Sequence, residues 1–207
     1  MKRIHFILVT LLALGGLTIA LIAYVRTHGF SARTEPSAVE AFVARKVRAL
    51  AVPNKSRDAT NPVAASPEVL SEAMEHFADH CAVCHANDGS GNTSIGKGLS
   101  PKPPDMRLAG TQNQTDGEIY YVIHNGIRFT GMPSFGPSGD DKVGQPDEDS
   151  WKLVHFIRHL PKITENEIQA MKKLNPKSQA ELQEEEQIRR FLAGEDIPQE
   201  EMTGHRH

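Results

Sequence analysis

The reactive side chains of this sequence are concentrated in one run of five residues, Cys81-Ala82-Val83-Cys84-His85, which contains both of its cysteines. Two thiols three residues apart on a helical turn reach the two vinyl groups along one edge of a porphyrin and can form thioethers with them. The adjacent histidine is then placed beneath the iron, for which neutral imidazole is a good ligand. The C-x-x-C-H spacing therefore predicts one covalently attached c-type haem.

Other uses of a cysteine pair fit this sequence less well. A thioredoxin-like redox pair belongs in a strand-helix-strand context, which is missing here. A structural zinc site needs four ligands, but there is no second cysteine pair, and His80 would join only by distorting the same turn. Two cysteines so close together also cannot form the framework of a disulfide-stapled domain. Haem attachment is the interpretation that these comparisons favour.

A second ligand to the iron is expected from a methionine, because a thioether sulfur is the usual choice in an electron carrier. Met132 lies between Gly131 and Pro133. Glycine lets the backbone approach a flat ligand closely, and proline stiffens the chain after the sulfur-bearing residue. The alternative is an ordinary methionine that fills a gap in the core. We predict that Met132 is the iron ligand.

The remaining methionines are weaker candidates for the iron. Met106 follows Pro103-Pro104-Asp105 and is expected to pack on the edge of the ring. Met74 shares the helix of His85 and would have to reach the opposite face of the ring. The other three are expected to lie outside the domain: Met1, Met171 and Met202.

Histidines outside the motif are weaker candidates for the iron than Met132. His124, His155 and His159 lie on or near amphipathic helices, where the default is a solvated or hydrogen-bonded side chain. A different possibility is that His205 and His207 form a metal-binding tail, but two imidazoles are too few for a firm site.

The segments that must position these residues all have helical patterns, and no stretch alternates with the period of a strand. The fold class is therefore all-α. Ser66 followed by Pro67 predicts a helix start, and Thr115 with Glu118 has the pattern of a capping box. Glycine- and proline-containing loops are expected over 86–114 and 126–146. The expected helices cover 38–50, 67–81, 115–124, 147 or 149 to 160, 164–174 and 178–193.

Length and charge limit the function classes. A length of 207 residues leaves room for one domain with extensions. The net charge of -3 gives no basic field for binding nucleic acid. The charge is uneven, because residues 1–66 have nine Lys and Arg against three Asp and Glu. Aromatic residues make up only 6% of the chain, so the core has less bulky material than usual. Another group is expected to fill part of that core.

Residues 6–25 contain no charged side chain and would form a helix about 30 Å long, which matches the hydrocarbon thickness of a bilayer. The competing interpretation is a cleaved secretory signal, whose apolar region is normally about 7–15 residues long. The longer run and the lack of an A-x-A-like site favour an uncleaved anchor. Flanking charges leave the orientation open, because Lys2 and Arg3 on one side face Arg26 and Arg33 on the other.

Taken together, residues 67–162 resemble a class I c-type cytochrome, and more narrowly the monohaem domains of the third subunit of cbb3-type oxidases. The resemblance rests on CAVCH at the end of a helix, a PPDM loop, the helix EIYYVIHNGI, the loop GMPSFG and a closing helix from Trp151. It implies a class I cytochrome c fold with Cys81 and Cys84 in thioethers, and with His85 and Met132 as axial ligands. It also implies that the carbonyl of Pro104 accepts a hydrogen bond from the free nitrogen of His85.

The resemblance further implies the organisation of the chain and its place in the cell. The expected parts are a cytoplasmic N-terminus (1–5), a transmembrane anchor (6–25), a periplasmic spacer with a short helix (26–65), the cytochrome domain (66–162) and a charged helical extension (163–207). The domain would face the periplasm from a bacterial inner membrane, since haem is attached covalently on the outer side.

These expectations define a membrane-tethered carrier of single electrons, with redox proteins as partners and no enzymatic activity of its own. Two alternatives remain open at this point. One is a haem enzyme or a sensor of peroxide or a gas, in which Met132 dissociates. The other is a cytochrome subunit of a larger oxidase or dehydrogenase.

Overall fold

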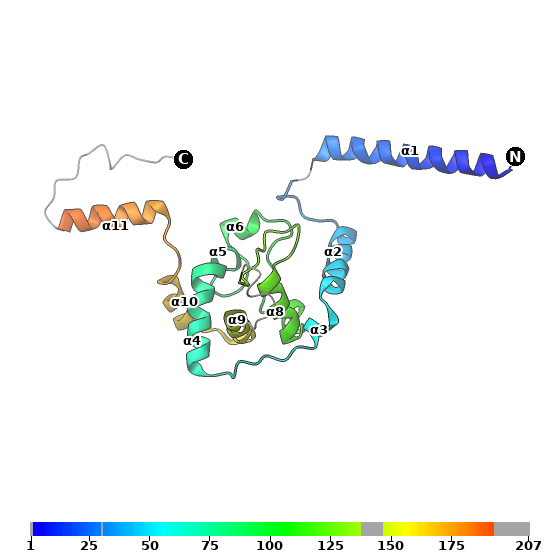
Figure 1. The fold of residues 1–207 in the computed structure, drawn as a ribbon. Helices are drawn as coiled ribbons and strands as arrows, with labels where there is room; N and C mark the ends of the chain where they lie inside the picture. The colour runs from blue at the N-terminus through cyan, green and yellow to red at the C-terminus, as the bar shows by residue number, and fades with distance from the viewer. Residues whose placement is uncertain (1, 30, 138–146, 193–207) are drawn as a thin grey trace.

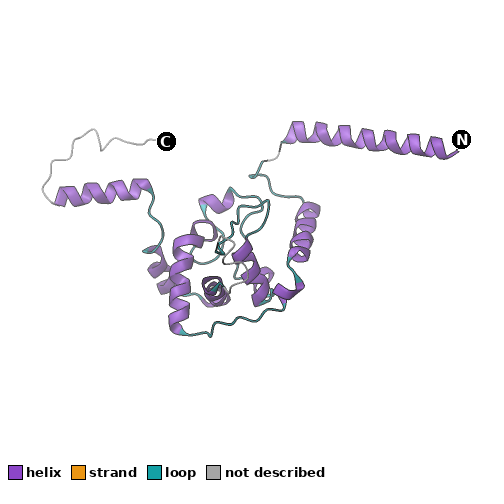
Figure 2. Ribbon diagram, in the orientation of Figure 1, coloured by secondary structure: helices purple, strands orange, loops and turns teal. Residues whose placement is uncertain are grey.

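The computed structural model describes residues 2–29, 31–137 and 147–192, and all regular structure in these ranges is helical (Figure 2). A cluster of short helices forms the centre of the molecule, while α1 (Lys2–His28) and α11 (Gln179–Leu192) extend away from it on opposite sides (Figure 1). The all-α prediction is therefore confirmed.

The two helices expected before the domain are present. Helix α1 contains the whole apolar run, and none of its residues is buried. Helix α2 (Ala38–Ala51) begins after Ser37, whose hydroxyl accepts a hydrogen bond from the backbone N–H of Glu40 at 3.2 Å. This bond satisfies one of the free N–H groups of the first turn.

One continuous helical segment leads into the cysteine motif. Helix α4 (Pro67–His76) starts at the predicted cap, where the hydroxyl of Ser66 accepts from the N–H of Val69. A single π-helical turn, Phe77–Cys81, follows and passes into α5 (Ala82–His85). The helix therefore extends a few residues beyond the predicted end at Cys81. Such π turns are rare and occur mostly next to functional sites.

The remaining predicted helix starts are also seen. Helix α8 (Asp116–Asn125) has the capping box of Thr115 and Glu118, and α10 (Glu165–Lys172) has a second one formed by Thr164 and Glu167. Helix α9 (Glu148–His159) is capped by Asp147 rather than by Asp149, and a short 3₁₀ turn, Leu160–Lys162, ends it. At the start of α11, the hydroxyl of Ser178 accepts from the N–H of Glu181.

Helices α4 and α9 pack against each other and form most of the core. Phe77 and Phe156 meet with ring centroids 4.9 Å apart, and Tyr120 of α8 stacks on Trp151 at 4.1 Å. Met171 of α10 is completely buried in the same core. The expectation that Met171 lies outside the domain is therefore wrong, because α10 folds back and covers the core.

Two segments outside the expected helices contain short helices. Residues 52–65 hold α3 (Asn54–Arg57), and residues 86–114 hold α6 (Ser94–Lys97) and α7 (Ala109–Gln112). One turn of helix is too short to produce a periodic pattern, so these elements cannot be predicted from periodicity. Of the predicted loop 126–146, residues 138–146 lie outside the described residues, as does residue 193, the predicted end of the last helix.

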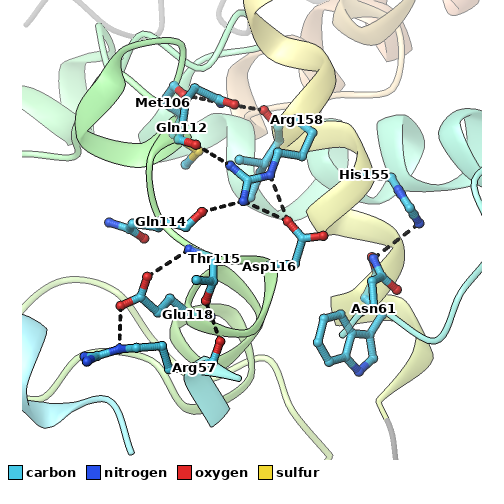
Figure 3. A network of polar contacts seen from close by, with 12 residues as sticks. Arg57, Asn61, Met106, Gln112, Gln114, Thr115, Asp116, Glu118, His155 and Arg158 are labelled. Atoms are coloured by element: carbon cyan, nitrogen blue, oxygen red, sulfur yellow. Dashed lines mark hydrogen bonds and ion pairs between the residues drawn. The ribbon is translucent and has the colours of Figure 1, made fainter. Parts of the chain in front are cut away.

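Helix α3 docks closely on the start of α8. The hydroxyl of Thr115 donates to the carbonyl of Arg57 at 2.7 Å, and Nε of Arg57 lies 2.9 Å from a carboxylate oxygen of Glu118 (Figure 3). At Gly117 the two backbones come so close that a Cβ would lie 1.9 Å from the carbonyl oxygen of Ser56. The segment that follows α2 is thus joined directly to the domain.

We predict that Gly117→Ala destabilises the haem-loaded protein by about 1–3 kcal/mol, the usual cost of overpacking, because the added methyl forces α3 away from α8. Denaturant unfolding followed by circular dichroism measures this. Gly110→Ala is the matched control, since a Cβ there has nothing within 4 Å and alanine favours a helix. Equal stability of the Gly117 and Gly110 variants would contradict the close docking.

Candidate haem site

Four residues singled out in the sequence line one cavity, namely Cys81, His85, Met106 and Met132, whereas Cys84 and Pro104 are not among its lining residues. It lies between the cysteine-bearing helical segment, α8, α9 and the loops that follow α6 and α8. Aliphatic and aromatic side chains make up most of its wall, so a bound group would be shielded from water. The lining residues are Phe77, Cys81, His85, Met106, Ile123, Met132, Leu153 and Ile157.

His85 is buried in this wall, and burial lowers its pKa to about 4. The imidazole is therefore neutral near pH 7, as a metal ligand must be. Its Nδ1 atom is buried and has no hydrogen-bond partner among the described residues. The expected hydrogen bond from His85 to the carbonyl of Pro104 is accordingly not formed in this structure, in which Pro104 is exposed. That role of Pro104 stays a prediction.

Both cysteines are free thiols, and the chain places them one turn apart beside His85. Burial raises the pKa of Cys81 to about 12 and also raises that of Cys84. Both groups are thus protonated near neutral pH. A thioether forms when an S–H group adds across the carbon-carbon double bond of a vinyl group, so reduced thiols are the form that the attachment requires.

The backbone turns sharply straight after His85. Ala86 has a φ of 59°, a left-handed conformation that costs energy for a residue other than glycine. Its N–H still donates to the carbonyl of Ala82 at 2.8 Å, and the N–H of Gly91 donates to the carbonyl of His85 at 2.8 Å. The hydroxyl of Thr93 donates to the carbonyl of Cys84 at 3.3 Å. The following loop therefore closes over the helix end that carries the motif.

Backbone hydrogen bonds fix the Met132 loop to the end of α8. The N–H of Ile127 donates to the carbonyl of Met132 at 3.1 Å, and the N–H of Phe135 donates to the carbonyl of Ile123 at 3.1 Å. Gly126, with a φ of 66°, begins the turn, and a side chain there would collide with the backbone of Met132 and Pro133. The loop thus folds back on its helix with Met132 beside the cavity.

Met106 also reaches the cavity, as expected of a residue that packs near the ring. Its carbonyl accepts from the side-chain amide of Gln112 at 2.7 Å, and the same amide donates to the carbonyl of Ile157 at 2.9 Å (Figure 3). The guanidinium of Arg158 donates to the carbonyl of Gln112 and to the carboxylate of Asp116. Gln112 and Arg158 therefore position the cavity wall at Met106. No sequence motif predicts this role.

The three histidines near amphipathic helices all have hydrogen-bond or ion-pair partners. Nδ1 of His124 lies 3.1 Å from the carboxylate of Asp147, Nε2 of His155 lies 2.8 Å from the carbonyl of Val63, and Nε2 of His159 lies 2.9 Å from Glu167. The part of the chain that the structure describes contains no group of three metal-ligating His, Cys, Asp or Glu side chains. His205 and His207 lie outside the described residues.

The cavity residues fit a haem in their chemistry. They supply the thiol of Cys81, the neutral imidazole of His85, a thioether sulfur and an apolar wall. The second thiol, that of Cys84, lies one turn from Cys81 and is not among the lining residues. A porphyrin is a large apolar plane with a metal at its centre, and this set of side chains meets each part of it.

Comparison with known proteins leads to the same class. Residues 68–157 match the family described as cytochrome C oxidase, cbb3-type, subunit III, which covers less than half of the chain. No curated protein matches the chain. The helical fold, the C-x-x-C-H motif and this match together show a cytochrome c domain similar to that of cbb3 subunit III. The domain carries one covalent haem c and serves electron transfer.

Two further properties come with this class of domain. Cytochrome c domains lie outside the cytoplasm, and they are typically electron carriers that work with redox partners rather than enzymes. Among the described residues, α1 is the one helix long and apolar enough to cross a membrane. Its position near the N-terminus fits both a membrane anchor and a signal sequence.

We predict that haem cannot be extracted from the protein with acidified acetone, and that intact mass shows the chain plus one haem. Replacing both thiols, in Cys81→Ser/Cys84→Ser, should release all of the haem into the solvent. Val83→Ser is the matched control, because it changes an exposed residue of the same motif and keeps both thiols. Haem that leaves the unaltered protein with the acetone would contradict thioether attachment.

Proposed function

We propose that this chain is a membrane-tethered periplasmic electron carrier in which His85 and Met132 are the axial ligands of the haem iron. The observation that carries the proposal is that the two side chains line one buried cavity from separate elements, His85 from α5 and Met132 from the loop after α8. With both axial positions held by the protein, the iron has no open site for a substrate. The chain is then a carrier and not an enzyme.

Each part of the site has a task in this proposal. Bound haem supplies an iron centre that takes up and releases one electron. Cys81 and Cys84 hold the porphyrin edge, and the neutral imidazole of His85 and the sulfur of Met132 favour the reduced state, which raises the reduction potential. The apolar wall formed by Phe77, Ile123 and their neighbours excludes water, and a low-polarity surrounding disfavours the additional charge of the oxidised state.

The backbone bonds around Met132 support a permanent ligand over one that leaves. An enzyme or gas sensor would need Met132 to move away, but its loop is tied to α8 through Ile123, Ile127 and Gly126. His124, which would be the candidate distal acid or base, is paired with Asp147. The site therefore favours electron transfer with a fixed ligand set.

We further propose that α1 remains as the anchor, with residues 1–5 in the cytoplasm and residues 26–207 in the periplasm of a bacterial inner membrane. All of its side chains lie outside the core, and its charged residues occur only near its ends. Tethering raises the effective concentration of the carrier towards redox proteins in the same membrane. The family match favours a membrane oxidase, or a protein that delivers electrons to one, as the partner.

Met132→Ala should remove the weak far-red absorption band that reports the iron-thioether bond, lower the reduction potential and let carbon monoxide bind the ferrous iron. The reason is that a methyl group replaces the sulfur while the haem stays attached. Absorption spectra with and without carbon monoxide, together with a redox titration, measure the three effects.

Met106→Ala is the control for this change, because Met106 lines the same cavity and is buried. It should keep the far-red band and exclude carbon monoxide. The ligand assignment is wrong if Met106→Ala loses the band while Met132→Ala keeps it. Carbon monoxide binding to the unaltered protein would favour an enzyme or a sensor.

The anchor makes a separate prediction about the mature protein. Alkaline carbonate washing should leave the haem protein in the membrane fraction, because a spanning helix resists extraction. N-terminal sequencing should find no new amino terminus beyond Val25. A haem protein released into the soluble periplasmic fraction, with such a new terminus, would show a cleaved signal instead.

A further inference from the structure

Helix α2 exposes its apolar side chains. Five large ones, at spacings of three, four and seven residues, lie on one face of the helix. Their exposed fractions run from 50% for Val43 to 84% for Leu50. A helix of a soluble domain normally buries such a face against the core. The five residues, called here the α2 apolar face, are Val39, Phe42, Val43, Val47 and Leu50.

The opposite side of α2 faces the protein. The half-buried residues of this helix are Ala41 and Arg48, which lie about half a turn away from the α2 apolar face. In the last turn of α2, the carbonyl of Ala49 accepts a hydrogen bond from the guanidinium of Arg57 at 2.6 Å, which joins this end of the helix to α3. The apolar face therefore points away from the domain.

The charges of α2 suit a lipid surface with anionic headgroups above an apolar layer. Arg45 and Lys46 are the basic residues outside the protein-facing side, and Glu40 in the first turn is the single acidic residue of the helix. Lys46 lies within the apolar face, with its Nζ 5.7 Å from the ring centroid of Phe42. A lysine in that place can keep its methylene stem among apolar groups and its ammonium at the level of lipid phosphates. Basic residues with a large apolar face are typical of helices that lie in a membrane interface.

The position of α2 along the chain brings it to the membrane. Nine residues, 29–37, separate it from α1, and an extended chain of that length spans at most about 30 Å. In Figure 1, α2 runs crosswise to α1 on the side of the domain from which α1 extends. An ion pair between Glu35 and Lys102 joins this connection to the domain. A helix crosswise to a spanning helix lies along the membrane plane.

We propose that α2 lies in the headgroup layer of the bilayer that α1 spans, with the α2 apolar face in the acyl boundary and with Arg45 and Lys46 at anionic phospholipids. The proposal rests on α1 being a retained anchor. It adds that the membrane holds the haem domain at a second place and so gives it a fixed orientation. A tether alone would leave the domain free to rotate.

The connection between α2 and the haem cavity is firm enough to transmit an orientation. Val52, at the end of α2, is buried, and α3 follows at once with its close contacts to α8. Gly117 lies against the backbone of Ser56, and Arg57 is paired with Glu118. Helix α8 carries the Met132 loop at its other end. A membrane-bound α2 therefore fixes the direction of the porphyrin plane relative to the bilayer.

Electron paramagnetic resonance of the ferric haem in oriented multilayers tests this orientation without any label. The full haem-loaded chain is reconstituted in bilayers that contain phosphatidylglycerol, which are then stacked and turned in the magnetic field. We expect the haem signal to change with the angle. Val43→Gln/Leu50→Gln should abolish the angular dependence while the protein stays in the bilayer. Ala44→Gln/Ala51→Gln, which adds the same side chains at exposed positions beside Glu40, should keep it.

Four results would overturn the proposal. A signal independent of angle, from unaltered protein that remains in the bilayer, would show that α2 does not orient the domain, while the anchor would stand. An angular dependence that survives Val43→Gln/Leu50→Gln would assign the orientation to another element. Orientation in native membranes but not in pure lipid would make a membrane protein the occupant of the α2 apolar face. Loss of the protein from the multilayers on washing would instead contradict the anchor, and the proposal with it.

Discussion

The buried imidazole of His85 is the constraint on which the rest of the site depends. Burial keeps the ring neutral, and its Nδ1 has no hydrogen-bond partner in the described part of the chain. A buried polar atom without a partner costs about 1–3 kcal/mol, so a site of this kind is stable only if another interaction compensates. A haem joined to the neighbouring thiols would compensate through a bond from its iron to the other ring nitrogen, and Nδ1 would remain for the hydrogen bond predicted with Pro104. The haem also adds apolar material to a core that is poor in aromatic residues.

Two rigid supports bring the ligands of such a haem together. The helical segment from Pro67 to His85 packs on α9 and ends in a strained turn at Ala86, which is held by backbone hydrogen bonds. The loop after α8 is tied to the helix from which it emerges, and this fixes the place of Met132. Gln112 and Arg158 connect the wall at Met106 to α9. A redox centre needs this kind of support, because little movement of the ligands between oxidation states keeps electron transfer fast.

The sequence was most informative where local chemistry decides the structure. The C-x-x-C-H motif, the caps at Ser66 and Thr115 and the glycine and proline around Met132 all act through neighbouring residues, so they can be recognised without a fold. The burial of Met171, the docking of α3 on α8 and the roles of Gln112 and Arg158 depend on residues that are distant in sequence. The outward apolar face of α2 also depends on distant residues. The periodicity of 38–50 predicts a helix, but it does not tell whether the apolar face of that helix points towards the domain or away from it.

The central claim is that the haem iron is held between His85 and Met132, and nuclear magnetic resonance of the ferrous protein with labelled methionine methyl groups tests it most directly. A methyl group bound to the iron lies over the porphyrin, whose ring current shifts its signal far outside the normal methyl range. We expect one such signal among the six methionines, and we expect Met132→Leu to remove it while Met106→Leu leaves it in place. A strongly shifted signal that disappears with Met106→Leu, or no such signal in the unaltered protein, would contradict the account.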